Sequence, residues 1–204
     1  MKQQDFLQIV DKHKDVISAI RDSAHTLHAA VNQHYDKVHP YGFHLDMVAH
    51  AVEQFGHAVC NSESDIVPLF FGAYYHDSIE DARQTYNDVK RIALRWMTEP
   101  QALMAAEIVY ALTNEKGRTR AERANDKYYR GIRETPYAPC IKLADRLANI
   151  TYSFTHSNDS NVHMKDVYRC EWPHFLQAIT TENADVRFAL PQEMIQTIEK
   201  LIAE

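Results

Sequence analysis

The sequence has few of the residues that form turns. Its 204 residues include only five glycines and seven prolines, which argues against a β protein with many short strands. No segment shows the sustained apolar–polar alternation of a half-buried strand. Apolar residues make up 45% of the chain, enough for a sizeable core. We therefore predict an all-α protein of about eight or nine helices, forming a single domain over residues 1–204.

Cysteine is also scarce. Cys60, Cys140 and Cys170 are far apart and form no CxxC motif, which excludes a disulfide framework and a zinc ribbon. The amino-terminal residues have an amphipathic pattern and not that of a signal peptide. No run approaches the ~20 apolar residues that span a bilayer. These absences predict a cytoplasmic protein with no membrane partner.

Positive charge is in deficit. The chain has 22 lysines and arginines against 28 acidic residues, a net charge of −6. A broad attraction to nucleic acid or acidic membranes is therefore not expected. An anionic substrate stays compatible with this balance if a metal and local cationic side chains supply the positive charge. Histidine, in contrast, is abundant at 12 residues, and we expect most of them to have no ligand role.

Apolar spacing of three and four residues predicts the helices. An amphipathic helix of roughly seven turns is expected over residues 6–35. Residues 67–75 are apolar on nearly every side, as in a helix at the middle of a bundle. Residues 118–133 are basic. Two last helices are expected within residues 156–204, where they either complete the core or form a homo-oligomer interface.

The apolar segment 67–75 ends in a dense polar cluster. His76 and Asp77 are followed four residues later by Glu80 and Asp81. In a continuous helix His76 would therefore share a face with Glu80, and Asp77 with Asp81. Such a cluster is a poor end for a purely structural helix. One imidazole and three carboxylates are instead ligands that suit a divalent cation with a water beside it.

A second unusual carboxylate, Asp145, lies in the centre of the apolar helix predicted around residues 141–150. Aspartate is unfavourable inside a helix, and a buried carboxylate needs a partner. Asn149 follows one turn later on the same face. The residues alone leave two explanations open, a salt bridge to Lys142 or Arg146, or a role as a metal ligand.

Three short motifs, taken in order, resemble one family. They are Tyr41-Gly-Phe-His44, His76-Asp77-Ser-Ile-Glu80-Asp81 and Lys142-Leu-Ala-Asp145-Arg-Leu-Ala-Asn149. The order of His, His-Asp and Asp resembles the metal ligands of the HD phosphohydrolase superfamily. The fuller pattern is similar to the hydrolase domain of RelA/SpoT enzymes and to small alarmone hydrolases, over about residues 20–155. Residues 112–116 also lie where that family has a turn of similar composition.

The resemblance implies a helical HD-domain enzyme with a defined site. It implies that one divalent cation, typically Mn²⁺ in this family, is bound by His44, His76, Asp77 and Asp145. It implies that Glu80 and Asp81 orient or deprotonate the attacking water, or protonate the leaving oxygen. It also implies a substrate-binding set, which consists of Tyr35, Tyr41, Lys142 and Asn149.

The resemblance further implies the reaction. The substrate would be a small nucleotide, guanosine tetra- or pentaphosphate, the alarmone of the stringent response. Hydrolysis of its 3′-pyrophosphate would give GDP or GTP and pyrophosphate. Asn149 would hydrogen-bond the sugar or phosphate of this nucleotide, and Tyr41 would pack beside the nucleoside.

Three positions depart from the family pattern. Tyr35 and Asp36 stand where the family carries an Arg-Lys pair that stacks on guanine and meets phosphate, and Ala82 stands where Thr is common. Metal-dependent phosphohydrolysis is therefore better supported than guanosine tetraphosphate as the substrate. The arginines of residues 118–133 either supply the missing cationic contacts or form a solvated face paired with the acids between them.

Three other functions stay open. An HD-type nucleotidase would act on a different nucleotide. A non-catalytic HD protein would bind a nucleotide without turnover, although such proteins usually lose a ligand or the Glu-Asp pair, and this chain keeps both. A plain helical scaffold would hold no metal at all.

Overall fold

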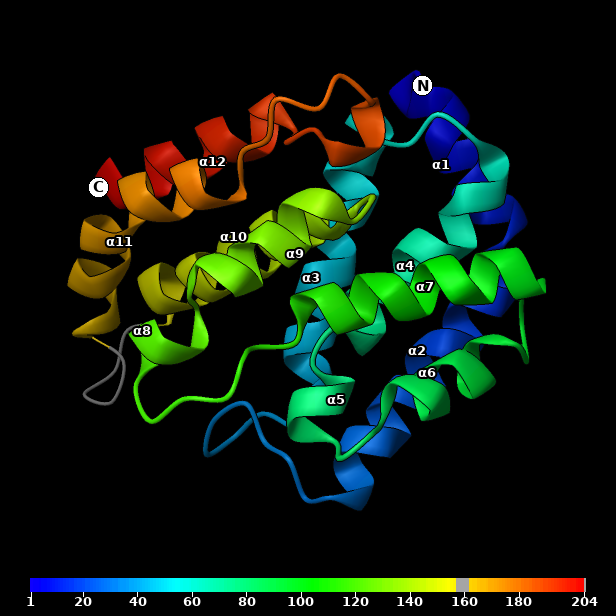
Figure 1. Ribbon diagram of the computed structural model, residues 1–204, viewed down its shortest axis with the longest axis horizontal. Coiled ribbons are helices and arrows are strands. Elements are labelled where there is room, and N and C mark those ends of the chain that lie inside the picture. Colours follow the sequence, from blue (N-terminus) through cyan, green and yellow to red (C-terminus); the bar gives the residue numbers. More distant parts are fainter. Residues whose placement is uncertain (157–161, 204) are drawn as a thin grey trace.

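The computed structural model describes residues 1–156 and 162–203 (Figure 1). These residues form helices and the turns between them, with one isolated β-bridge between His34 and Pro40 and no named strand. Within the described ranges, ten α-helices have eight residues or more and two consist of a single turn. The predicted all-α class is confirmed.

The helix predicted over residues 6–35 consists of two helices and the start of a loop. α1 (Gln3–Lys12) and α2 (Lys14–Ala30) are separated at His13, where φ is −102° and ψ is 10°. This break lets the buried faces of both helices reach the core. Soon after α2, Asn32 has a φ of 57°, a left-handed conformation that Asn tolerates and that stops a helix. The predicted single helix was therefore wrong.

Three helices lie at the centre of the molecule. They are α3 (Gly42–Phe55), α4 (Ile66–Tyr75) and α10 (Ala138–Thr155), and α3 packs against both α4 and α10 (Figure 1). Every residue of α4 is buried, which confirms the central position predicted for residues 67–75. The centre of the fold is therefore built from segments that are far apart in the sequence.

A glycine sets the distance between α4 and its neighbours. α7 (Glu99–Leu112) packs against α4 on one side. A Cβ added at Gly72 of α4 would lie 2.7 Å from side-chain atoms of Ile108 on α7 and of Ile141 on α10. Gly72 therefore permits a close approach, and a larger residue there would require one of these isoleucine side chains to move.

Four shorter helices surround this centre. α5 (Ser78–Asp81) follows α4 almost directly, and α6 (Tyr86–Ala93) begins at a capping box formed by the residues that flank its first turn. The basic segment predicted at residues 118–133 divides into α8 (Arg120–Arg123) and α9 (Asp126–Glu134). The side chain of Asn125 caps α9, which explains why a new helix begins there.

The last two helices complete the core. α11 (Met164–Ile179) and α12 (Gln192–Ala203) both pack against α10. Phe175 of α11 and Ile198 of α12 are almost fully buried, so core completion, the first of the two roles considered for these helices, is observed. No helix in the described part of the chain combines the length and the apolar character that a membrane crossing needs.

Candidate metal centre

The three central helices bring the predicted metal ligands together. His44 lies in the first turn of α3, Asp145 lies in the middle of α10, and His76 and Asp77 follow the end of α4. The side chains of His44 and His76 are each 2% exposed, whereas those of Asp77 and Asp145 are 19% and 14% exposed. The two carboxylates therefore form the accessible side of the cluster.

The ligand atoms lie within reach of a single cation. His44 Nε2 is 3.3 Å from both His76 Nε2 and Asp145 Oδ1, and His76 Nε2 is 4.0 Å from Asp145 Oδ1. One atom from each of these three residues lies within 4.8 Å of the other two. Two ligand atoms that are ~2.1 Å from one divalent ion, at right angles, are about 3 Å apart. The three residues can therefore hold a metal ion.

Asp77 reaches the same point because the chain bends. Its Oδ2 lies 2.9 Å from His76 Nε2 and 3.8 Å from His44 Nε2. In a regular helix, successive side chains point about 100° apart, so neighbours would not share a site. α4 ends at Tyr75, and Asp77, with φ of −99° and ψ of 4°, leaves the helical region before α5 begins. The continuous helix considered for residues 76–81 is therefore not formed, and the bend brings the side chains of His76 and Asp77 to the same site.

The donor atoms have the chemistry of a cation site. His76 Nδ1 is 2.9 Å from the carbonyl oxygen of Ala73, so this nitrogen is the donor and Nε2 is directed at the cluster, a common arrangement in metal-binding histidines. His44 Nδ1 is buried without a hydrogen-bond partner among the described residues. Imidazole nitrogens and carboxylate oxygens that face one another need a proton or a cation between them. The residues present therefore fit a divalent cation.

Charges within the cluster stabilise one another. Burial raises the pKa of the Asp145 carboxyl, but Lys142 and the two imidazoles bring it well below its usual range. Burial also opposes ionisation of Asp77, and His76 nevertheless lowers its pKa. Burial lowers the pKa of His76, yet the Asp77 carboxylate outweighs that effect and raises it to about 9. Both carboxylates are therefore ionised near neutral pH, and metal binding would release the His76 proton.

The salt bridge considered for Asp145 is present together with the ligand arrangement. Lys142 Nζ is 2.8 Å from Asp145 Oδ2, while Oδ1 of the same carboxylate faces His44. Arg146 is directed away from Asp145 and pairs with Glu171 at 2.9 Å. The two explanations for Asp145 are therefore compatible, because each uses a different oxygen.

Two of the predicted substrate-binding residues contact the ligands. The Tyr35 hydroxyl donates to Asn149 Oδ1 at 3.0 Å, and Asn149 Nδ2 donates to Asp145 Oδ1 at 2.6 Å. The Tyr35 ring also stacks on His44, with ring centroids 5.1 Å apart. These contacts fix the orientation of one carboxylate and one imidazole. Sequence reasoning missed this chain of contacts, because Tyr35 and Asn149 are 114 residues apart.

Tyr41 contacts the other carboxylate. Its hydroxyl donates to Asp77 Oδ2, and its ring stacks on His28 with centroids 4.7 Å apart. Burial and the Asp77 charge raise the pKa of Tyr41, so its hydroxyl stays a donor. His28 was not predicted at the site. It is 1% exposed, and neither ring nitrogen has a partner among the described residues; only its place on the buried face of α2 could have pointed to it.

Glu80 and Asp81 lie on α5, one turn beyond Asp77. The Asp81 amide donates to the carbonyl oxygen of Asp77 at 2.8 Å, and burial and the Asp77 charge raise the pKa of Asp81. Glu80 is exposed and accepts two hydrogen bonds from the Asn114 side chain, at 2.8 and 3.0 Å. Asn114 was not predicted as a site residue, although the family-like turn at residues 112–116 was a signal that could have found it.

Comparisons with known proteins leave the geometry as the main guide to function. The chain matches no model of a known protein family, and no curated protein matches it significantly. The resemblance to HD phosphohydrolases therefore depends on three short motifs. Side chains from all three motifs lie in one cluster, although the motifs are on different helices.

Proposed function

We propose that this chain is a metal-dependent phosphohydrolase of the HD type. The observation that carries the proposal is the meeting of His44, His76, Asp77 and Asp145, with separations of 2.9–4.0 Å between the facing nitrogen and oxygen atoms. Two imidazoles and two carboxylates leave positions on a cation for water and substrate. A divalent cation bound there would supply positive charge that acidifies water and offsets the charge of a phosphoryl group.

Mn²⁺ is the cation we propose. A mixed set of imidazole and carboxylate ligands is compatible with several divalent metals, Mn²⁺ among them. Tyr41 and Asn149 support the ligand set, since each donates a hydrogen bond to one of its carboxylates. Hydrogen bonds of this kind fix ligand orientation, and their loss typically weakens metal binding by about 10- to 100-fold.

Glu80 and Asp81 are the residues we propose for proton transfer. A general base must lie within hydrogen-bond reach of the water it activates, and both carboxylates stand one turn beyond Asp77. Asn114 fixes the direction of Glu80 through two hydrogen bonds. Glu80 would accept the water proton on a carboxylate oxygen, and Asp81 would orient that water or return a proton to the leaving oxygen.

The most specific candidate reaction is hydrolysis of the 3′-pyrophosphate of guanosine tetraphosphate to GDP and pyrophosphate. A second candidate, an HD-type nucleotidase that acts on another nucleotide, is favoured by the positions that depart from the family pattern. The Tyr35 hydroxyl is bound to Asn149. Asp36 accepts hydrogen bonds from Tyr152 and His39. Neither residue offers the cationic contact that the family uses for guanosine tetraphosphate.

A substrate panel with Mn²⁺ tests the proposal. Release of pyrophosphate from guanosine tetraphosphate would support the first candidate, whereas release of inorganic phosphate from nucleoside monophosphates alone would replace it by the second. Binding of nucleotides without any turnover would contradict the proposed enzyme and indicate a non-catalytic nucleotide-binding protein.

Two aspartate variants provide the matched control. Asp77→Ala should abolish both metal content and turnover, because it removes a ligand. Asp46→Ala should retain both, because Asp46 binds Arg21 and His25 at the surface of α2 and α3. Absence of metal from both proteins would indicate a plain helical scaffold, and equal bound metal in both would show that Asp77 is not a ligand.

A further inference from the structure

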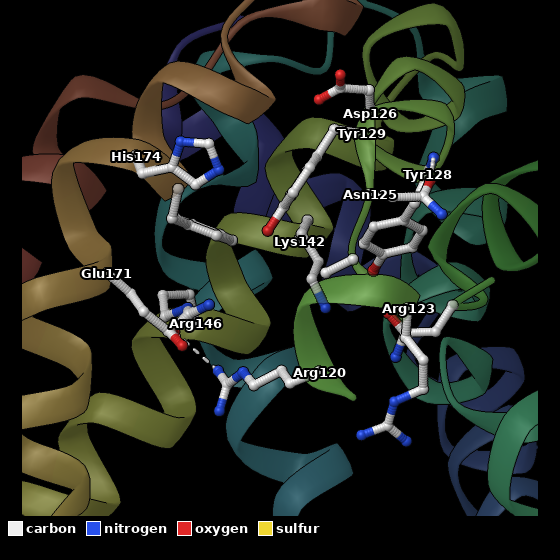
Figure 2. A pocket seen from close by; sticks show the side chains of 13 residues that line it. Arg120, Arg123, Asn125, Asp126, Tyr128, Tyr129, Lys142, Arg146, Glu171 and His174 are labelled. Atoms are coloured by element: carbon white, nitrogen blue, oxygen red, sulfur yellow. Dashed lines mark hydrogen bonds and ion pairs between the residues drawn. The ribbon is translucent and has the colours of Figure 1, made fainter. Parts of the chain in front are cut away.

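A pocket of about 780 Å³ lies between α8, α9, α10 and α11 (Figure 2). Two of its lining residues contact the candidate metal centre. Lys142 is 2.8 Å from Asp145 Oδ2, and Asn114 donates to Glu80 at 2.8 Å. The pocket and the metal centre therefore share a wall, so a ligand in the pocket would lie beside the centre.

The lining of this pocket is positive, in a chain whose net charge is −6. Four cationic side chains line it against two carboxylates, namely Arg120, Arg123, Lys142 and Arg146 against Asp126 and Glu171. Lys142 is already paired with Asp145 of the metal centre. The three arginines are the other cationic side chains of the lining, and two of them have one carboxylate between them.

Two of the arginines share a single carboxylate oxygen. Arg120 Nη2 and Arg146 Nη1 each lie 2.9 Å from Glu171 Oε2, and Figure 2 shows Glu171 directed toward Arg120. Arg146 is only 9% exposed, and its guanidinium carbon lies 5.0 and 4.2 Å from the ring centroids of Tyr168 and Phe175. Glu171 carries one negative charge and the two arginines carry two positive charges, so one positive charge is not compensated by it. Arg146 is already held in position by its ring contacts.

The third arginine, Arg123, has no acidic partner among the described residues. Its side chain lines the pocket and makes no hydrogen bond or ion pair with any residue that the structure describes. Lys127, a few residues later, differs, since it pairs with Glu115 at 2.7 Å. The explanation of this basic segment as a salt-bridged surface therefore fits Lys127 and does not fit Arg123.

We propose that the pocket is a subsite for those phosphate groups of the substrate that are not hydrolysed, with Arg120, Arg123 and Arg146 as their ligands. The identity of the ligand rests on the proposed phosphohydrolase function. The substrate class is a nucleotide with phosphate groups at two places, one at the metal centre and one at the arginines. Glu171 holds Arg120 and Arg146 in position, and a phosphate oxygen would take over its contacts on binding.

The departure at Tyr35 and Asp36 agrees with this assignment. These residues replace the cationic pair of the resembling family, and their polar groups bind other side chains of the chain itself. A substrate with several phosphates still needs cationic partners besides the metal. The arginines of the pocket supply that charge from a different wall of the same site.

Titration of the protein with inorganic pyrophosphate in the presence of EDTA tests the subsite without the metal. Calorimetry should show saturable binding to the wild type. Arg120→Gln and Arg123→Gln should each weaken it by about tenfold, the effect of one charge-assisted hydrogen bond. Glu171→Gln should tighten it, since it removes the competing carboxylate.

Arg130→Gln is the matched control, because Arg130 is an exposed residue of α9 that does not line the pocket. It should bind pyrophosphate as the wild type does. Equal losses in Arg130→Gln and Arg123→Gln, or no binding to the wild type, would overturn the proposal. Thermal unfolding of each variant separates lost binding from lost folding.

Kinetics on the Mn²⁺-loaded protein then connect the subsite to the substrate. Arg123→Gln should raise KM for the hydrolysed nucleotide about tenfold and change kcat little, because it removes a contact remote from the reacting phosphate. An unchanged KM, with pyrophosphate binding still lost, would overturn the assignment to the substrate. A protein that hydrolyses no nucleotide but binds pyrophosphate through these arginines would refute the proposed function and retain the anion site.

Discussion

Two buried carboxylates, Asp65 and Asp145, have opposite surroundings. Asp65 accepts hydrogen bonds from the Tyr137 hydroxyl at 2.6 Å and from Ser64 Oγ at 2.9 Å, so each oxygen meets a donor. Asp145 meets Lys142 and Asn149, but its Oδ1 also faces His44 Nε2, which in turn faces His76 Nε2. Both oxygens of each carboxylate meet a donor, but Asp145 Oδ1 also belongs to a cluster of facing nitrogen and oxygen atoms that a proton or a cation completes.

The difference separates a structural buried acid from a proposed metal ligand. Burial alone does not distinguish them, since Asp65 is 8% exposed and the Asp145 side chain is 14% exposed. Asp65 connects the segment before α4 to Tyr137, directly before α10, which gives it a structural role. The partner atoms distinguish the two carboxylates, because acceptor atoms that face one another are costly unless positive charge lies between them.

The largest expected effect is on metal binding. Asp145→Asn removes the charge of one ligand and should lower Mn²⁺ affinity by more than about 100-fold, beyond the loss typical of an outer hydrogen bond. Asp65→Asn should leave the affinity unchanged. Metal content after dialysis and calorimetric titration measure both. Wild-type stability should rise by about 2.7 kcal/mol at a Mn²⁺ concentration of 100 Kd, and EDTA should remove that gain.

The distinction between Asp65 and Asp145 would be wrong if both variants lost metal equally, or if Asp145→Asn kept a full equivalent of bound metal. Either result would mean that the facing nitrogen and oxygen atoms do not form the binding site. If Asp65→Asn lost the metal and Asp145→Asn kept it, the ion would lie beside Asp65.

The next effect concerns stability at the structural carboxylate. Tyr137→Phe removes the hydroxyl that donates to Asp65 and leaves a buried carboxylate oxygen without that donor. We expect it to lower the free energy of unfolding by about 1–3 kcal/mol. Urea unfolding with Mn²⁺ and with EDTA should give the same loss, because Asp65 takes no part in metal binding. A loss that depended on the metal would contradict the distinction between the two carboxylates.

The helices and the residues proposed as metal ligands could be predicted from the sequence, because each has a physical signature there. The apolar spacing of α3 and α10 indicates which faces are buried, and the nearly continuous apolar run of α4 indicates burial on all sides. Asp145 was visible because a carboxylate inside an apolar helix is costly. The break at His13 and the bend at Asp77 were not visible, because neither position carries a proline or glycine that would mark it in the sequence.

Contacts between distant residues were also beyond the sequence. Tyr35 was predicted to meet the substrate, yet its hydroxyl binds Asn149, 114 residues away. The acid partners of the basic segment could not be assigned either, because Glu171, the partner of Arg120, lies 51 residues further along the chain. Which cationic side chains stay unpaired depends on such contacts, and therefore on the folded structure.

A smaller effect is expected from His28, a buried base whose ring nitrogens have no hydrogen-bond partner among the described residues. Burial lowers its pKa to about 4, below the value of ~6.5 in an unfolded chain. The unfolded state therefore binds a proton first as pH falls, and stability is lost between about pH 6.5 and pH 4. At about pH 5 this loss is up to about 2 kcal/mol, and His28→Phe should not suffer it.

Urea unfolding in EDTA, at neutral pH and at about pH 5, measures the difference between wild type and His28→Phe. His50→Gln is the control, because His50 is exposed at the surface of α3. We expect His28→Phe to lose less stability than the wild type on acidification, because the imidazole has no proton acceptor among the described residues. An equal loss would mean that the His28 imidazole has such an acceptor in the folded state, in contradiction to the structure.

The smallest effect is expected at Asp46, which also lies beside an imidazole. Its carboxylate accepts from Arg21 at 2.7 Å and from His25 at 3.0 Å, and it is 36% exposed. Burial opposes ionisation of Asp46, but His25 and Arg21 lower its pKa. Its stabilising contribution is therefore present above the unfolded-state pKa of ~3.9 and is lost as pH falls through the lower folded value.

Asp46→Ala should cost no more than about 1 kcal/mol near neutral pH, as is typical of exposed ion pairs. It should leave Mn²⁺ content unchanged, because Asp46 meets only one imidazole and its other partner is a cation that a metal ion would have to displace. Unfolding in urea and metal analysis of the purified variant measure the two quantities. Loss of metal by Asp46→Ala would mean that a carboxylate beside one imidazole is sufficient for metal binding. Facing acceptor atoms would then not distinguish a metal site from a structural carboxylate.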